Sequence, residues 1–292
     1  VVNELGAVQQ LGIPSISAGI QENWIIEEAP WGSISISLVA LLIVSTLIIN
    51  EKLLRRKSRR WSEGIAGGDT PVWELNGFRQ LAAQIITGLP PLIALGIPLI
   101  WSILNAELLT RGLDETLIPI TIRTIFFGLI AAIIVVTLST LIVIAKRFNK
   151  TSWLNIIAFM TGIGYAIPGA VLALAFLPFT QYSWTNSSSL ILIWGYIIRF
   201  LAVAKGGADA ALERINPNID ESASILGSNW FNIIRKIHLP LLKGPIIIGS
   251  LLVFVDTIKE LPLTFTLRFY DSDTLSVRIY QYAGDGFIAE SI

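Results

Sequence analysis

The stretch IPITIRTIFFGLIAAIIVVTLSTLIVIA, residues 118–145, is a long and almost uninterrupted apolar run. A helix needs about 20 mainly apolar residues to cross a bilayer. This stretch is longer than that and contains one charged residue, Arg123. Taken alone, it could also be a buried core helix of a soluble protein, so the rest of the chain decides between the two.

Six apolar runs of this kind occur along the chain, separated by segments that hold most of the charged residues. Several contain Gly or Pro, as in GLPPLIALGIP at 88–98, and membrane helices tolerate these residues where neighbours satisfy the backbone. Six such runs predict an all-α fold, a polytopic membrane helix bundle. The spans are predicted at residues 32–50, 84–104, 118–145, 153–178, 188–204 and 245–267.

The composition of the whole chain agrees with a membrane protein. Of its 292 residues 53% are hydrophobic and 14% are charged, whereas a soluble domain has about 25% charged residues. The apolar composition implies membrane lipid as a partner, and the net charge of zero gives no indication of nucleic acid. The absence of Cys and the single His, His238, exclude disulfides, thiolate or His-cluster metal sites and most His-based catalysis.

The basic residues predict the orientation of the chain in the membrane. Fifteen Lys and Arg lie in segments 51–83, 146–152 and 205–244, against three in the connections that alternate with them and in the tail. Cytoplasmic loops carry such an excess of positive charge. These three segments are therefore predicted to be cytoplasmic, and the N-terminal segment and the tail are predicted to face outward.

A weak internal repeat predicts that the chain derives from two similar halves. GIPSISAGI at 12–20 aligns with DSDTLSVRI at 271–279, and both segments lie on the predicted outer side. The chain begins with Val and shows no signal peptide, so we expect it to start within a longer protein built of two six-helix halves. On this interpretation residues 1–50 are an outer loop and the last helix of a first half, 51–83 are a basic cytoplasmic linker, and 84–292 are a second half with five helices and its final helix missing.

The cytoplasmic segment 206–243 interrupts the apolar pattern with two predicted short helices. Asn216 suits the N-cap of the first helix, and Pro217 suits its first position. Gly227 suits the left-handed residue that ends such a helix. This segment is therefore predicted to be folded and not an open loop.

The second short helix is predicted to start at Trp230, after a cap at Ser228 or Asn229, and to run to about His238. Pro240 is expected to discourage further helix. The apolar side chains of the two helices exceed what such short helices can bury on each other. They would either fill a groove in another protein or pack under the chain's own helices.

The same segment carries a spaced motif: Glu-Ser-Ala, three residues, Gly, nine residues, then Ile-x-Leu-Pro. It resembles the EAA motif of ABC-transporter inner-membrane permeases, with Ser222 in place of the first Ala. The resemblance implies a type I ABC importer permease fold in which 206–243 is a coupling segment that docks into an ABC ATPase subunit dimer. The coupling residues that it implies are Glu221, Ser222, Ala223, Gly227, Ile237, Leu239 and Pro240.

A second, narrower resemblance concerns KELP at 259–262, LR at 267–268 and DTL at 273–275. These residues look like those of the iron(III)-type permeases, whose two halves are fused in one chain. The resemblance implies a multi-pass protein of the bacterial inner (plasma) membrane that moves iron(III) from a periplasmic solute-binding protein to the cytoplasm by alternating access. Related fused permeases carry thiamine or other small solutes, which are the alternative substrates.

The chain itself is not expected to be an enzyme. It shows no Walker motif, so ATP would be bound and hydrolysed by the separate ATPase subunit. No cofactor, catalytic residue or metal ligand is predicted within it. A membrane-embedded enzyme would need a convergent polar site, which the lone His and the missing Cys disfavour.

Charged residues inside the predicted span 245–267 form the remaining candidate site. Asp256, Lys259 and Glu260 share one helix face, and charge within a membrane marks either a structural ion pair or a functional path. We expect Asp256 to pair with Lys259, and Glu260 to pair with Arg123, which lies at a similar predicted depth. Both readings stay open: an ion-pair network that fixes helix packing, or residues that line or gate the translocation path.

Three smaller expectations concern single residues. Arg199 is predicted to extend its side chain to the cytoplasmic interface, and His238 to be a surface residue. The glycines at 162, 164 and 169 are predicted to allow close helix packing. An ion-coupled secondary transporter remains the alternative class of protein, with Asp256 and Glu260 as its ion sites, although it would have no use for the coupling segment.

Overall fold

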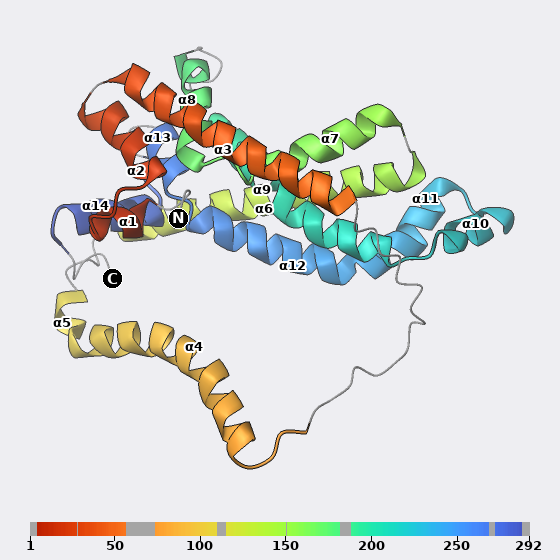
Figure 1. The fold of residues 1–292 in the computed structure, drawn as a ribbon, viewed down its shortest axis with the longest axis horizontal. Helices are drawn as coiled ribbons and strands as arrows, with labels where there is room; N and C mark the ends of the chain where they lie inside the picture. Colours follow the sequence, from red (N-terminus) through yellow and green to blue (C-terminus); the bar gives the residue numbers. More distant parts are fainter. Residues whose placement is uncertain are drawn as a thin grey trace.

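The computed structural model is a bundle of helices (Figure 1), and no strand occurs in the part of the chain that it describes. The predicted all-α polytopic architecture is therefore confirmed. The described residues are 5–27, 29–56, 74–109, 115–149, 151–181, 188–268 and 272–287. Five described helices are long and apolar enough to cross a membrane: Pro30–Asn50, Phe78–Leu104, Leu117–Phe148, Ser189–Glu213 and Trp230–Ile258.

The predicted number of six spans is too high, because residues 153–178 do not form one helix. They form α7 (Ser152–Ile163) and α8 (Gly169–Phe176), followed by the 3₁₀ turn η3 (Leu177–Gln181). The break lies at residues 164–168. Pro168 has extended backbone angles and no N–H to continue the ladder of α7, so the chain changes direction there.

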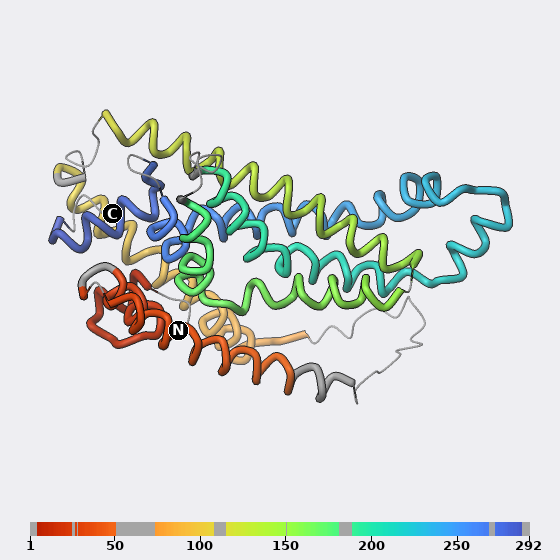
Figure 2. The backbone as a smooth tube through the Cα atoms, turned by 90° about the horizontal axis from the view of Figure 1, so that it is seen from above, coloured from red at the N-terminus to blue at the C-terminus, as the bar shows by residue number. Residues whose placement is uncertain are grey.

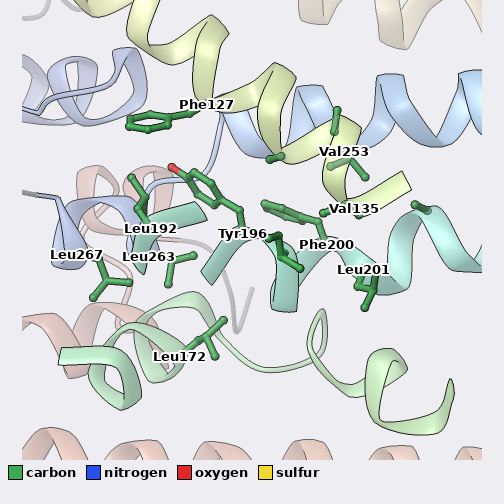
Figure 3. Close-up of a cluster of buried hydrophobic side chains, with 14 of the residues drawn as sticks. Phe127, Val135, Leu172, Leu192, Tyr196, Phe200, Leu201, Val253, Leu263 and Leu267 are labelled. Atoms are coloured by element: carbon green, nitrogen blue, oxygen red, sulfur yellow. The ribbon is translucent and has the colours of Figure 1, made fainter. Parts of the chain in front are cut away.

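Three helices form the centre of the bundle: α6 (Leu117–Phe148), α9 (Ser188–Glu213) and α12 (Leu239–Ile258). Each packs along the other two, and both views show them lying side by side (Figures 1 and 2). The main cluster of buried apolar side chains lies where they meet (Figure 3). Its members include Phe127, Val135, Tyr196, Phe200 and Val253, together with Leu263 from α13 (Pro262–Leu267).

A second apolar cluster closes one end of this three-helix centre. It joins Val143 and Ile144 of α6 to Leu212 of α9 and Leu242 of α12. This end of the bundle continues into α10 (Pro217–Ile225), α11 (Trp230–Ile233) and the π-helix η5 (Ile234–His238). The predicted coupling segment therefore projects from a well-packed end of the bundle.

Short helices from both ends of the chain gather at the opposite end (Figure 1). They are α1 (Gly6–Gln10), α2 (Ile16–Gln21), the π-helix η1 (Glu22–Ile26), the start of α3 (Pro30–Arg56), α13 and α14 (Leu275–Gly284). The two segments of the weak repeat correspond in structure, since Ser15 and Thr274 are the extended residues just before α2 and α14. The division of the chain into two halves stays a prediction.

Helix α4 (Phe78–Leu104) differs from the other long helices. None of its residues is buried, and it lies apart from the bundle in Figure 1, leading into α5 (Ala106–Leu109). Three prolines lie inside it, at positions 90, 91 and 98. Its apolar surface is therefore left uncovered by the described part of the chain.

Candidate functional site

The first helix of the coupling segment forms as the sequence predicts. The Asn216 side chain accepts a hydrogen bond from the backbone N–H of Asn218 at 3.0 Å, and Pro217 is the first residue of α10. Gly227 has φ +81°, a left-handed conformation that side chains with a Cβ rarely adopt. The cap, the proline and the glycine thus fix where α10 begins and where the chain turns back.

The second helix of the segment starts as predicted but does not end as predicted. Asn229 caps it by accepting from the N–H of Asn232 at 2.9 Å. The expected stop at Pro240 is wrong, because α11 continues through η5 into α12 without interruption. Pro240 follows directly on the π-helix η5 and lies inside this continuous helix, where its missing N–H removes one backbone hydrogen bond without ending the helix.

The tip of the coupling segment exposes large apolar side chains. Ile225 is 86% exposed and Leu226 is 85% exposed, and Trp230 beside them is 67% exposed. Ile233, one turn further, is 2% exposed, so the segment divides into an anchored base and a free tip. The motif residues Glu221, Ser222, Gly227, Leu239 and Pro240 are exposed, and Ala223 and Ile237 are half-buried.

A group of polar contacts joins the coupling segment to the end of α6. Arg147 Nε donates to Asp220 Oδ2 at 2.8 Å, and Arg147 Nη1 donates to the carbonyl of Leu212 at 3.3 Å. His238 Nε2 lies 3.0 Å from Asp220 Oδ1, without the alignment of a hydrogen bond. The expectation that His238 is a surface residue is wrong: it is fully buried, with its ring edge-on to Phe148.

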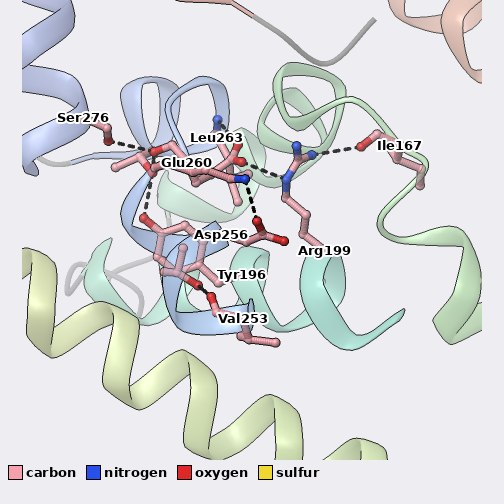
Figure 4. A network of polar contacts seen from close by, with 11 residues as sticks. Ile167, Tyr196, Arg199, Val253, Asp256, Glu260, Leu263 and Ser276 are labelled. Carbon is pink, nitrogen blue, oxygen red and sulfur yellow. Dashed lines mark hydrogen bonds and ion pairs between the residues drawn. The ribbon is translucent and has the colours of Figure 1, made fainter. Parts of the chain in front are cut away.

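The buried charge at Glu260 is paired with Arg199 (Figure 4). Arg199 Nε donates to Glu260 Oε2 at 3.0 Å, and Arg199 Nη1 donates to the carbonyl of Ile167 at 3.0 Å. The other carboxylate oxygen accepts from the N–H of Leu263 at 3.2 Å. The expected pair of Glu260 with Arg123 is therefore wrong, and Arg123 Nη1 reaches the carbonyl of Asp273 at 3.5 Å instead.

Arg199 does not extend to the interface as predicted, because α9 is longer than the predicted span 188–204. The helix has 26 residues and runs to Glu213, so Arg199 lies near its middle and is 1% exposed. Its guanidinium contacts two helix breaks at once. One is the turn at residues 164–168 between α7 and α8, and the other is the turn at 259–261 between α12 and α13.

Further polar contacts surround Glu260. The Tyr196 hydroxyl and the Thr264 hydroxyl lie 2.7 Å apart, and the hydroxyls of Thr264 and Ser276 donate to the Glu260 carbonyl at 2.8 and 2.9 Å. Lys259 Nζ lies 2.8 Å from Asp256 Oδ1, so the pair expected there is present. The lysine side chain is 68% exposed, whereas the side chains of Arg199 and Glu260 are 2% and 7% exposed.

Two of the three glycines predicted to allow close packing do so. A Cβ on Gly164 would lie 1.9 Å from the Ile198 carbonyl oxygen of α9, and one on Gly169 would lie 2.6 Å from Glu260 Oε1. Gly162 has open space around it, so the expectation is wrong at that position. The close approaches place the α7–α8 break directly against Arg199 and Glu260.

A known protein family matches the part of the chain that holds these features. Residues 140–283, which contain the coupling segment, Arg199 and Glu260, match the family described as binding-protein-dependent transport system inner membrane component. The chain is 25% identical over 97% of its length to the Fe(3+)-transport system permease protein FbpB 2 of Haemophilus influenzae. It covers 57% of that relative, so it spans little more than half of the relative's length.

Two further relatives match a shorter part of the chain. The putative ferric transport system permease protein FbpB 1 of Haemophilus influenzae is 29% identical over 60% of the chain and 28% of the relative. The ferric transport system permease protein FbpB of Actinobacillus pleuropneumoniae is 25% identical over 62% of the chain and 27% of the relative. Residues 140–283 thus resemble the inner-membrane components of binding-protein-dependent transport systems, and the chain, with its five long apolar helices, is a multi-pass inner-membrane protein.

Proposed function

We propose that this chain is part of the transmembrane permease of an ATP-driven importer that moves iron(III) into the cytoplasm by alternating access. One observation carries the proposal: the EAA-like segment ends in an exposed apolar tip on a buried base. The apolar atoms of Ile225, Leu226 and Trp230 have no partner that would remove them from water in the described chain. Short helices that present such a face fit a groove in another protein.

The partner at this tip is the ABC ATPase subunit dimer, which binds and hydrolyses ATP. Glu221, Ser222 and Ala223 lie on α10 within the segment that would enter its groove, and the turn at Gly227 separates α10 from α11. Leu239 and Pro240 begin α12, which leads back into the bundle. Closure of the dimer would displace the segment, and the core helices that continue from it would follow.

At the opposite end of the bundle, a solute-binding protein delivers the substrate. Iron(III) is proposed because three relatives carry ferric or Fe(3+) transport in their names. Among the described residues no three His, Cys, Asp or Glu side chains gather as a metal site. The binding protein is therefore proposed to hold the metal until release, and thiamine or another small solute is the alternative substrate.

The longer protein is proposed to consist of two fused halves. Residues 1–50 belong to the first half and 84–292 to the second, with the basic linker 51–83 between them. The matching helix starts at Ser15 and Thr274 support this division, since each lies at the same end of the bundle. The outer short helices α1 and α14, which contact each other, would then come from different halves.

The experiment replaces Leu226 by Asp at the tip, inside the full-length protein, and asks whether the ATPase subunit still co-purifies. Loss of the subunit is expected, because a carboxylate would have to lose its water in an apolar groove. Leu11→Asp is the matched control, since Leu11 is 72% exposed at the opposite end of the bundle. Uptake of ferric iron that persists without ATP and follows a proton gradient would instead favour the ion-coupled secondary transporter.

A further inference from the structure

Asp220 is the point at which α10 meets the end of α6 and the start of α12. It lies in the first turn of α10 and accepts from Arg147, which is next to the last residue of α6. The same guanidinium binds the carbonyl of Leu212 near the end of α9. On its other side the carboxylate faces His238, the last residue before α12. The Asp220 carboxylate thus faces Arg147 at the end of α6 and His238 just before α12, and Arg147 links it to α9.

Helix α10 has little else to hold it against the bundle. None of its residues is buried, and it packs mainly against α11. The side chains of Arg147 and Asp220 are only 15% and 17% exposed, so water screens their attraction less than it would at an open surface. A hydrogen bond between two charged groups is also stronger than one between neutral groups.

We propose that Asp220 is the positioning residue that fixes the coupling segment to the core helices, with Arg147 as its partner. A displacement of α10 by the ATPase is then passed to α6 through Arg147 and to α12 through the contact with His238. This inference rests on the proposed function and adds to it the residue through which motion is transmitted. Neither Asp220 nor Arg147 belongs to the EAA-like motif.

The structure also indicates that the contact can be removed without loss of the fold. The apolar cluster of Val143, Ile144, Leu212 and Leu242 joins the same helix ends independently of Asp220. Asp220→Asn keeps the size of the side chain and removes its charge. The exposed tip at Ile225 and Leu226 is unchanged by this substitution, so docking of the ATPase subunit is expected to remain.

The test reconstitutes the full-length protein with its ATPase subunit and binding protein in liposomes. Uptake of radiolabelled ferric iron and release of phosphate from ATP are measured together. For Asp220→Asn we expect normal co-purification of the ATPase, continued hydrolysis, and about a tenfold fall in iron taken up per ATP, within the range typical of coupling between two sites. A merely structural role would lower uptake and hydrolysis together and leave their ratio unchanged.

The matched control is Asp209→Asn. Asp209 pairs with Lys205 at 2.6 Å and has a similar side-chain exposure, 22%, but both residues lie within α9. This substitution breaks an ion pair within one helix, whereas Asp220→Asn breaks a contact between two helices. The ratio of iron uptake to ATP hydrolysis should therefore stay at the wild-type value. Arg147→Gln should lower the ratio as Asp220→Asn does, and the double variant should fall no further, because both remove one contact.

The inference is overturned if Asp220→Asn takes up as much iron per ATP as the wild type. It is also overturned if the losses caused by Asp220→Asn and Arg147→Gln add in the double variant. Loss of the ATPase subunit from Asp220→Asn also overturns it, since Asp220 would then be a docking residue. These outcomes leave the proposed function intact. That function fails separately, if the wild-type protein takes up ferric iron without ATP or binds no ATPase subunit.

Discussion

Arg199 and Glu260 form a buried ion pair, 3.0 Å between Nε and Oε2, that holds two helix breaks together. Arg199 comes from the middle of α9 and also binds the Ile167 carbonyl beside the α7–α8 break. Glu260 lies in the α12–α13 break and accepts from the first turn of α13. Helix breaks inside a membrane expose backbone groups that need partners. The pair supplies two of these partners.

Replacing Glu260 by Gln is expected to destabilise the protein strongly. The change leaves the Arg199 charge buried without its counter-charge, at a cost of about 3–5 kcal/mol. Thermal denaturation of the detergent-solubilised protein, followed by the loss of monodisperse material, measures it. The double variant Arg199→Met with Glu260→Gln should be more stable than Glu260→Gln alone.

Asp256→Asn is the control for the same experiment. Its partner Lys259 is 68% exposed and can turn to water, so the loss should stay below about 1 kcal/mol. Equal melting of the Glu260→Gln variant and the wild type would contradict a stabilising role for the pair. Measuring uptake as well as stability distinguishes two roles for Glu260, as a gate of the translocation path or as part of an ion pair that fixes helix packing. Normal uptake by an assembled Glu260→Gln variant would exclude the gate.

Gly164→Ala is predicted to disturb the contact between α7 and α9. The new methyl would lie 1.9 Å from the Ile198 carbonyl oxygen, which is backbone and cannot rotate away. Overpacking of this kind costs about 1–3 kcal/mol, and the backbone clash puts this variant at the upper end. The thermal midpoint of the purified protein should fall for Gly164→Ala and not for Gly162→Ala, where the structure leaves open space.

Trp230→Ala is predicted to weaken ATPase binding without weakening the fold. The side chain is 67% exposed, so little packing is lost when it is removed. As an aromatic anchor in a partner's groove it would contribute about 2 kcal/mol or more, and its loss should raise the Kd for the ATPase subunit about 30-fold. Titration of the subunit onto the purified permease in nanodiscs measures this Kd.

Ile233→Ala, one turn from Trp230, is expected to weaken the fold and leave ATPase binding unchanged. This side chain is 2% exposed, so its truncation should lower stability by about 2–5 kcal/mol. The ATPase affinity of the protein that remains folded should change little. An unchanged Kd for Trp230→Ala would show that the exposed tip is not the docking surface.

Gly227→Ala is predicted to strain the turn between α10 and α11. An alanine at φ +81° costs about 1–2 kcal/mol, because its Cβ approaches the following carbonyl. Gly206→Ala is the comparison: Gly206 lies within α9 with nothing within 4 Å, so alanine there should be neutral or stabilising. The thermal midpoint should therefore fall for Gly227→Ala and stay or rise for Gly206→Ala, and an equal fall in both variants would contradict the strain.

The sequence predicts those parts of the structure that depend only on residues close to one another in the chain, such as helix caps and turns. Asn216 before Pro217, Gly227 and Asn229 act within a few residues of themselves, and each has its predicted role. The composition and the apolar runs were enough for the helical membrane class. They did not reveal that the run at 153–178 breaks at Pro168, because apolarity does not distinguish one helix from two.

Contacts between distant segments could not be predicted in the same way. Arg199 was placed near an interface because the charges that follow it suggested that the helix ends at about 204. The helix instead runs on to Glu213, which moves Arg199 to the interior. Arg147 and Asp220 are 73 residues apart, and each alone resembles an ordinary loop charge. Only the packing of α6 against α9 and α12 brings such groups together.

The continuous course of α11, η5 and α12 has a mechanical consequence. Its 29 residues, from Trp230 to Ile258, would span about 43 Å at 1.5 Å per residue if the helix were straight. Two features inside it allow bending: the π-helix η5 and Pro245 within α12. The turn at residues 259–261, where Glu260 binds Arg199, follows at its end. A displacement of the exposed tip would therefore reach the ion pair only to the extent that the helix stays straight at these two positions.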